Sequence, residues 1–487
     1  MPVSEILRDN VTRHSMTETS DYKQRPNVIC LAIDRLHVGY VGAYGNTWTS
    51  TPALDQLAAD SFVLDRAIID SPQLDVIYRS LWLGLHALCP NNRESQREHL
   101  ATLLSRAGWQ TALLADAKEV TELPSAAAFA ERMLMHSITG KIGSASIGSC
   151  NFHSDTNKIL ISDNHKVAVS VEETDAAAIF AAAGNWLEAA RQEPFFLWIH
   201  TGTLGRVWDA PLEFRQMFAD EDDPPLGNWA NVPNRVLPPR FDPDELLAAT
   251  HAYAGQVSLI DQFIGSLLEV IENTGHAGNT IFICFSLRGF PLGEHDRVGP
   301  CDESLYSELT HVPWFIRIPV GTGSPGHLPQ LVQPADLPAT ILDYCGLNHS
   351  LPMDNRVLSS GAATEIGFGR SLLPLSGGKH LATFDRACVV APPNQRVFIT
   401  PFWSLRLSNC VGADPEHASE EDATAQLSHR SELFVKPDDW LEVNEVSDRC
   451  PEIKEKMEAA MTQFTLACQS GSPAMLAKLP DEITADF

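Results

Sequence analysis

Strand-like and helix-like segments alternate along most of this chain, from residue 25 to about residue 385. The run from Arg25 to Asp34 predicts a buried first strand that ends in a carboxylate. Thr51 to Asp60 follows with a threonine cap, a proline in the first turn and apolar residues at helical spacing. This alternation predicts an α/β fold with a doubly wound, mixed and mostly parallel sheet flanked by helices.

The two ends of the chain differ from this pattern. Residues 1–24 are polar and predict a flexible N-terminal leader, which leaves residues 25–385 for the α/β domain. Residues 386–487 predict a small C-terminal α+β subdomain. Short β-rich runs there indicate an antiparallel sheet, and Pro451 to Ala467 predicts a closing helix with proline at its start.

The charge balance restricts the partners of the chain. It has 35 basic and 62 acidic residues, a net charge of −27, which disfavours binding to nucleic acid or to an anionic membrane. Neither a signal peptide nor a membrane span is visible. The ten cysteines are scattered without CxxC pairs, as in reduced proteins. We therefore expect a cytoplasmic protein.

Short motifs along the chain keep a fixed order and spacing. They are Gly42–Asn46, Thr51–Asp60, Ser71–Pro72, Ser80–Gly84, Leu292–His295, Thr310–Arg317, Ala335–Asp343 and Gly369–Leu372. Together they resemble the sulfatase family of the alkaline phosphatase superfamily. This resemblance implies a sulfatase-like fold. It also identifies the positions where the family holds a divalent cation and a nucleophile, which ester hydrolysis requires.

Most of those positions carry other residues. The resemblance places Asp34 on the first metal carboxylate and Arg35 on the second, while Leu287 and Arg288 stand at two further metal positions. The nucleophile position, Cys or Ser in the family, falls on Leu74, with Asp75 beside it.

Neighbouring family positions are also changed. Tyr78 falls on the arginine of the nucleophile motif, although a one-residue slip would give that role to Arg79. The position of a central histidine falls on Gly205, and Pro300 lies near the position of a lysine. The chain is therefore identified as a divergent member that lacks most of the family's active-site residues.

Guanidinium groups are permanently charged donors and cannot ligate a metal. Arg35 and Arg288 either pair with carboxylates such as Asp34, Asp75 or Glu294 and close the old cleft, or form an anion-binding pocket. Two routes to a rebuilt site stay open. Asp75 can serve as a carboxylate nucleophile, and a zinc site can draw on His37, His200, Glu294 and His295.

These residues predict a noncatalytic protein of the sulfatase fold that binds a protein partner or an anionic small molecule. The alternative is a sulfuric or phosphoric ester hydrolase with a rearranged site. That site would use Asp34, Asp75, Arg79, Glu294 and His295, and only it would require calcium or magnesium. A third alternative is that the protein is a structural subunit of a homo-oligomer.

Overall fold

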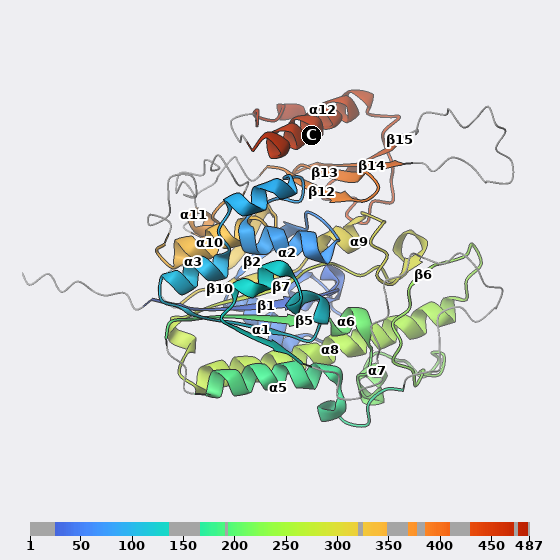
Figure 1. The fold of residues 1–487 in the computed structure, drawn as a ribbon. Coiled ribbons are helices and arrows are strands. Elements are labelled where there is room, and N and C mark those ends of the chain that lie inside the picture. Colours follow the sequence, from blue (N-terminus) through green and yellow to red (C-terminus); the bar gives the residue numbers. More distant parts are fainter. Residues whose placement is uncertain are drawn as a thin grey trace, which may run out of the picture.

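The computed structural model describes residues 25–135, 166–189, 193–319, 325–347, 369–376, 385–409, 429–471 and 476–485. The predicted leader, residues 1–24, lies outside these ranges. A nine-stranded sheet forms the centre of the molecule, with helices on both of its faces (Figure 1). The predicted doubly wound α/β fold is confirmed.

The central sheet is mixed and mostly parallel. Its strand order is β11-β2-β10-β7-β1-β5-β3-β4, with β9 pairing to β2. Only β10 and β9 run antiparallel to their neighbours. The strands are β1 (Asn27–Ile33), β2 (Phe62–Ile68), β3 (Gln110–Ala115), β4 (Glu131–Leu134), β5 (Phe195–Thr201), β7 (Thr280–Ser286), β9 (His311–Val312), β10 (Trp314–Arg317) and β11 (Gly326–Val332).

The register of the three central strands brings their carboxyl ends together. Ile33 at the end of β1 pairs with Thr201 of β5 on one side and with Ser286 of β7 on the other. All seven residues of β1 are buried, as expected of a central parallel strand covered on both faces. The residues that follow these strands therefore meet at one edge of the sheet.

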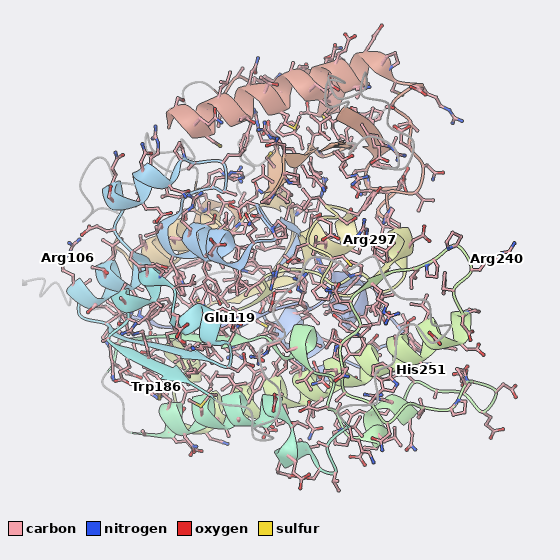
Figure 2. All side chains as sticks on the ribbon, turned by 45° about the vertical axis from the view of Figure 1, so that its right-hand side comes forward. Arg106, Glu119, Trp186, Arg240, His251 and Arg297 are labelled. Carbon is pink, nitrogen blue, oxygen red and sulfur yellow. The ribbon has the colours of Figure 1, made fainter. Side chains whose placement is uncertain are left out.

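Two hydrophobic cores, one on each face, hold the helices to the sheet. One face is covered by α1 (Pro52–Ala59), α5 (Asp175–Glu188) and α8 (Pro243–Asn273), the other by α2 (Leu74–Leu83), α3 (Leu100–Arg106) and α10 (Asp336–Tyr344). Side chains fill the space between the layers (Figure 2). Trp186 of α5, for example, packs edge-on against Phe195 of β5, with ring centroids 5.3 Å apart.

Shorter elements complete this part of the chain. They are α4 (Lys118–Thr121), α6 (Thr203–Arg206), α7 (Leu212–Gln216), α9 (Ser307–Thr310), α11 (Leu373–Ser376) and a two-stranded ribbon of β6 (Arg235–Val236) and β8 (Arg297–Val298). Among the residues described, no helix is long and apolar enough to cross a membrane.

The C-terminal part forms a second, antiparallel sheet with a helix packed on it (Figure 1). Its strands lie in chain order, and the helix α12 runs from Pro451 to Ser470, three residues beyond the predicted end. Gly471 ends the helix in a left-handed conformation. The exact domain division stays a prediction. The strands are β12 (Ala387–Ala391), β13 (Gln395–Ile399), β14 (Trp403–Asn409) and β15 (His429–Val435).

Candidate functional site

Asp34 and Arg288 face each other at the carboxyl edge of the sheet. Asp34 directly follows β1 and Arg288 lies two residues after β7. The guanidinium of Arg288 donates from Nε to Asp34 Oδ1 at 2.8 Å and from Nη2 to Asp34 Oδ2. Both residues are buried. This is a two-point arginine–carboxylate pair, the strongest common geometry for such an interaction.

Asp302 extends this pair to Arg35. Its Oδ2 accepts from Arg288 Nη1 at 3.1 Å, and its Oδ1 accepts from Arg35 Nη2 at 2.6 Å. We call Asp34, Arg35, Arg288 and Asp302 the ion-pair cluster. Asp302 was not expected, because it belongs to the loop between β8 and α9 and to no motif. The signal that could have found it is the presence of two buried arginines, which require two carboxylates.

The backbone of Arg35 adopts a left-handed conformation with φ of 73°, which is uncommon for a residue with a side chain. Tyr253 of α8 holds this turn, since its hydroxyl donates to the Arg35 carbonyl at 2.7 Å and accepts from the His37 amide at 2.8 Å. Arg35 is thereby directed across Gly205, where a side chain would meet it: a β-carbon at Gly205 would lie 2.8 Å from Arg35 Cγ.

The positive and negative side chains of the ion-pair cluster balance one another. Burial alone would raise the pKa of Asp34, but the charge and hydrogen bonds of Arg288, with the charge of Arg35, lower it to about 2. Burial opposes the charged form of Arg288 too, yet the carboxylates of Asp34 and Asp302 raise its pKa above the ordinary value. Asp34 and Arg288 are therefore both charged at neutral pH, and the cluster as a whole sets two guanidinium groups against two carboxylates.

Helix α2 presents Tyr78, and not Arg79, toward this edge. The Tyr78 hydroxyl lies 2.7 Å from His200 Nδ1 at the end of β5. Arg79 points elsewhere: its guanidinium donates to Asn91 Oδ1 at 2.6 Å and to the carbonyls of His86, Ala87 and Cys89. The structure does not bring Arg79 into the ion-pair cluster.

The two residues at the nucleophile position do not face a shared reactive centre. Leu74 begins α2 and is half-buried against the hydrophobic core, and Asp75 beside it is exposed. Leu287, at a metal position, is fully buried in the core, and its amide donates to the Ile33 carbonyl at 2.9 Å. No hydrogen bond or ion pair that we observe links Asp75 or Glu294 to either arginine. Of the carboxylates expected to neutralise them, only Asp34 does so.

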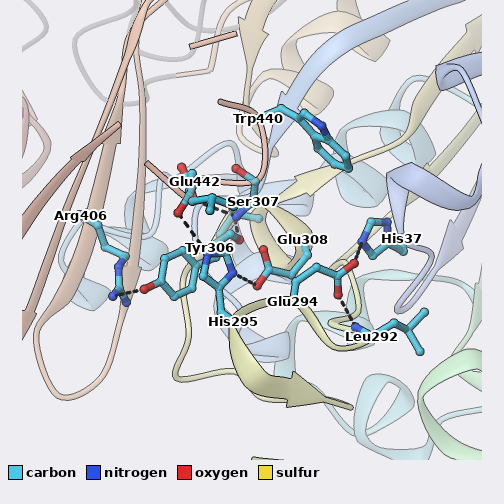
Figure 3. Close-up of polar contacts among 12 residues, drawn as sticks. His37, Leu292, Glu294, His295, Tyr306, Ser307, Glu308, Arg406, Trp440 and Glu442 are labelled. Carbon is cyan, nitrogen blue, oxygen red and sulfur yellow. Dashed lines mark hydrogen bonds and ion pairs between the residues drawn. The ribbon is translucent and has the colours of Figure 1, made fainter. Parts of the chain in front are cut away.

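The histidine and glutamate candidates fall into separate pairs (Figure 3). His37 Nε2 lies 3.6 Å from Glu294 Oε1, whereas His295 Nδ1 lies 2.9 Å from Glu308 Oε1. The His295 ring stacks on Tyr306, and Arg406 of β14 lies on that same Tyr306 ring, 3.9 Å from its centroid.

A divalent cation does not fit the donors at this edge. Both oxygens of Asp34 accept from Arg288, and the neighbouring family positions hold two guanidinium groups and a leucine, none of which can ligate a metal. Within the described parts of the chain, no group of three or more His, Cys, Asp or Glu side chains is arranged to hold a metal ion.

Comparisons with known proteins agree with the arrangement of strands and motifs. The family model described as Sulfatase matches residues 26–347. An arylsulfatase of Clostridium perfringens is 24% identical over 377 residues, which cover 66% of this chain and 76% of that protein. An N-acetylglucosamine-6-O-sulfatase of Bacteroides thetaiotaomicron is 33% identical over 96 residues, 20% of this chain and 17% of that protein.

Solved structures show the same fold. A phosphonate monoester hydrolase of Agrobacterium radiobacter superposes with a TM-score of 0.66 at 17% identity, covering 92% of this chain and 96% of that one. A 2-O GAG sulfatase superposes with a TM-score of 0.63 at 15% identity, covering 91% and 93%. At such identities these likenesses concern the fold alone. Because the family model spans well over half of its residues, the chain belongs to the sulfatase family.

Proposed function

We propose that this protein keeps the sulfatase fold without hydrolysing sulfate or phosphate esters, and that it acts by binding a partner. The observation that carries the proposal is the two-point pairing of Arg288 with Asp34. Both oxygens of the one carboxylate kept at the family's metal positions are hydrogen-bonded to a cation that is part of the chain.

The groups near the nucleophile position support the same proposal. Leu74 has no nucleophilic atom, and Asp75 is exposed at the start of α2. Burial raises the pKa of Tyr78 well above its usual value, so its hydroxyl stays protonated and is a poor nucleophile.

The alternative is an ester hydrolase with a rearranged site, which would need calcium or magnesium and would combine Asp75 with Glu294 and His295. The contacts favour it less. Glu294 pairs with His37, and His295 pairs with Glu308 and contacts the Glu442 carbonyl at 3.2 Å. General acid and base groups must converge on one bound ester to act together.

Of the two kinds of partner, the contacts favour a protein over an anionic small molecule. An anion pocket requires guanidinium groups that still carry excess positive charge, whereas Arg35 and Arg288 are matched by Asp34 and Asp302. A homo-oligomer is one form such a protein partner can take, and sedimentation velocity would measure it. A cytoplasmic location is part of the proposal, supported by the buried free thiols of Cys30, Cys284 and Cys388.

A turnover assay tests the proposal. The purified protein is incubated with 4-nitrophenyl sulfate, 4-nitrophenyl phosphate and a 4-nitrophenyl phosphonate, each with added Ca²⁺, Mg²⁺, Mn²⁺ or Zn²⁺ and with a chelator. An active arylsulfatase serves as the positive control. We expect no turnover above background. Turnover that is lost in Asp34→Ala or Asp75→Asn would show a working site and overturn the proposal.

A further inference from the structure

We infer that the guanidinium groups of Arg288 and Arg35 take over the structural role of a divalent cation at the carboxyl edge of the sheet. A metal ion in such a place joins carboxylates that come from separate segments of the chain. Here Arg288 does so. It bonds Asp34 after β1, Asp302 in the loop before α9 and, through Nη1, the Pro72 carbonyl before α2 at 2.9 Å.

The hydrogen bonds of Arg288 leave none of its side-chain nitrogens without an acceptor. Nε and Nη2 are used by Asp34, and Nη1 is shared between Asp302 and Pro72. Arg35 supplies the second positive charge through Asp302. Two guanidinium groups therefore carry the same charge as one divalent ion, and they balance two carboxylates.

Both arginines are held in place by neighbouring groups. The hydroxyl of Ser286 donates to the Arg288 carbonyl at 2.7 Å and accepts from the Leu36 amide at 3.1 Å, which joins the turns after β7 and β1. Tyr253 fixes the turn of Arg35, and the absence of a side chain at Gly205 leaves room for its stem. The residues around Arg288 and Arg35 therefore fix the positions of both arginines.

If the guanidinium of Arg288 is removed, we expect the remaining carboxylates to bind a divalent cation in its place. The carboxylates of Asp34 and Asp302 both accept from the Arg288 guanidinium, at Nε and at Nη1, so both face the space that this group fills. Without it the buried Asp34 and the partly exposed Asp302 share only the charge of Arg35, and a divalent cation supplies the missing positive charge.

Thermal unfolding tests whether a divalent cation stabilises the protein when Arg288 is removed. Wild type, Arg288→Met and Arg370→Met are melted in chelator, in millimolar CaCl₂ and in millimolar MgCl₂ at constant ionic strength. Arg370 is the matched control, because it also makes a two-point pair with a buried carboxylate, that of Asp336 (3.1 and 2.9 Å), away from the ion-pair cluster. We expect no response of wild type to either cation.

For Arg288→Met we expect a melting temperature several degrees lower in chelator, with at least half of the loss restored by Ca²⁺ or Mg²⁺. Arg370→Met should fall without any recovery. A wild type stabilised by either cation, or an Arg288→Met variant that neither cation stabilises, overturns the inference. Should Arg288→Met yield no folded protein under any condition, the neutral Arg288→Gln decides: a loss partly restored by Ca²⁺ or Mg²⁺ supports the inference and a loss that is not restored overturns it.

The inference rests on the same ion-pair cluster as the proposed function, but its readout is stability. Ester turnover by a wild type that shows no cation response would overturn the proposed function and leave this inference standing.

Discussion

The stem of Arg35 lies against the α-carbon of Gly205, so closely that a β-carbon at Gly205 would stand 2.8 Å from Arg35 Cγ. Real β-carbons do not approach a neighbour to that distance. The two positions belong to separate sequence motifs, and each departs from the family pattern. Their contact gives these departures a common physical reason, since the arginine occupies space that a side chain at residue 205 would need.

Gly205→Ala is expected to destabilise the protein by about 1 to 3 kcal/mol, the usual cost of inserting a side chain into a tightly packed position. Gly205 lies in the short helix α6, where alanine is intrinsically the better residue, so the sign opposes helix propensity. Chemical denaturation measures the change. Gly278→Ala is the control, because a β-carbon there meets nothing within 4 Å.

The double variant Arg35→Ala with Gly205→Ala tests the cause. If the two side chains compete for one space, the double variant is more stable than the sum of the single losses predicts, by at least about 1 kcal/mol. Additive losses would mean that Gly205 is required for another reason.

The left-handed turn at Arg35 predicts that glycine is a more stable replacement than alanine at this position, the reverse of the usual order. Arg35→Gly and Arg35→Ala both lose the bond to Asp302, but glycine adopts a φ of 73° without strain. The glycine variant should therefore be the more stable by about 1 kcal/mol. At Arg288, which is not among the positive-φ residues, the alanine variant should be the more stable of the two. If the alanine variant were the more stable one at both positions, the turn at Arg35 would not be strained.

Asp34 predicts how the protein loses stability in acid. Its folded pKa of about 2 lies below the ordinary 3.8, so it adds about 2 kcal/mol of stability that is present above pH 4 and lost as the pH falls toward 2. The difference in unfolding free energy between wild type and Asp34→Asn should therefore shrink between pH 5 and pH 2.

Asp261 gives the opposite sign and serves as the comparison. Burial raises its pKa to about 6 although it accepts from the amides of Ala53 and Leu54, so its contribution should grow as the pH falls from 7 to 4. If the difference in unfolding free energy between wild type and Asp34→Asn grew as the pH fell, as expected for Asp261→Asn, the pairing of Asp34 with Arg288 would be excluded.

The His295–Glu308 pair predicts a loss of stability on the alkaline side. Burial acts to lower the pKa of His295, but the hydrogen bond and charge of Glu308 outweigh it and raise that pKa; burial raises the pKa of Glu308. Stability from the pair is then fully present below pH 6.5 and lost as the pH rises through the raised His295 value. The advantage of wild type over His295→Gln should fall between pH 6 and pH 9.

His327 is the matched control for that measurement. It pairs with Asp65 at 2.6 Å, but its side chain is 62% exposed, and exposed pairs contribute little. His327→Gln should show no change of stability difference over the same pH range. A similar decline in both variants would point to a general effect of charge.

The sequence was sufficient for the fold because its signals are local. The strand predicted within Arg25 to Asp34 is observed as β1 from Asn27 to Ile33, and α1 begins at Pro52 after Thr51 as predicted, although the Thr51 side chain makes no capping hydrogen bond. The ends of parallel strands meet by geometry alone, which placed Asp34 and Arg288 at one edge.

The contacts within the site could not be predicted in the same way. Arg288 and Asp34 are 254 residues apart in the chain, and Arg35 and Asp302 are 267 apart. Whether Tyr78 or Arg79 faces the edge depends on the rotation of α2 by one residue, about 100° around the helix axis. His295, a candidate site residue, pairs with Glu308 and stacks on Tyr306, whose ring also contacts Arg406 of β14.

The contact of Gly205 with Arg35, and the pairing of Arg288 with two carboxylates, link the residues at these family positions to one another. A histidine at residue 205 collides with the stem of Arg35, an aspartate at residue 35 adds a third carboxylate beside Arg288, and the loss of Arg288 strands two negative charges. Each of these single changes is expected to lower stability, so the residues at these positions constrain one another and are expected to change together.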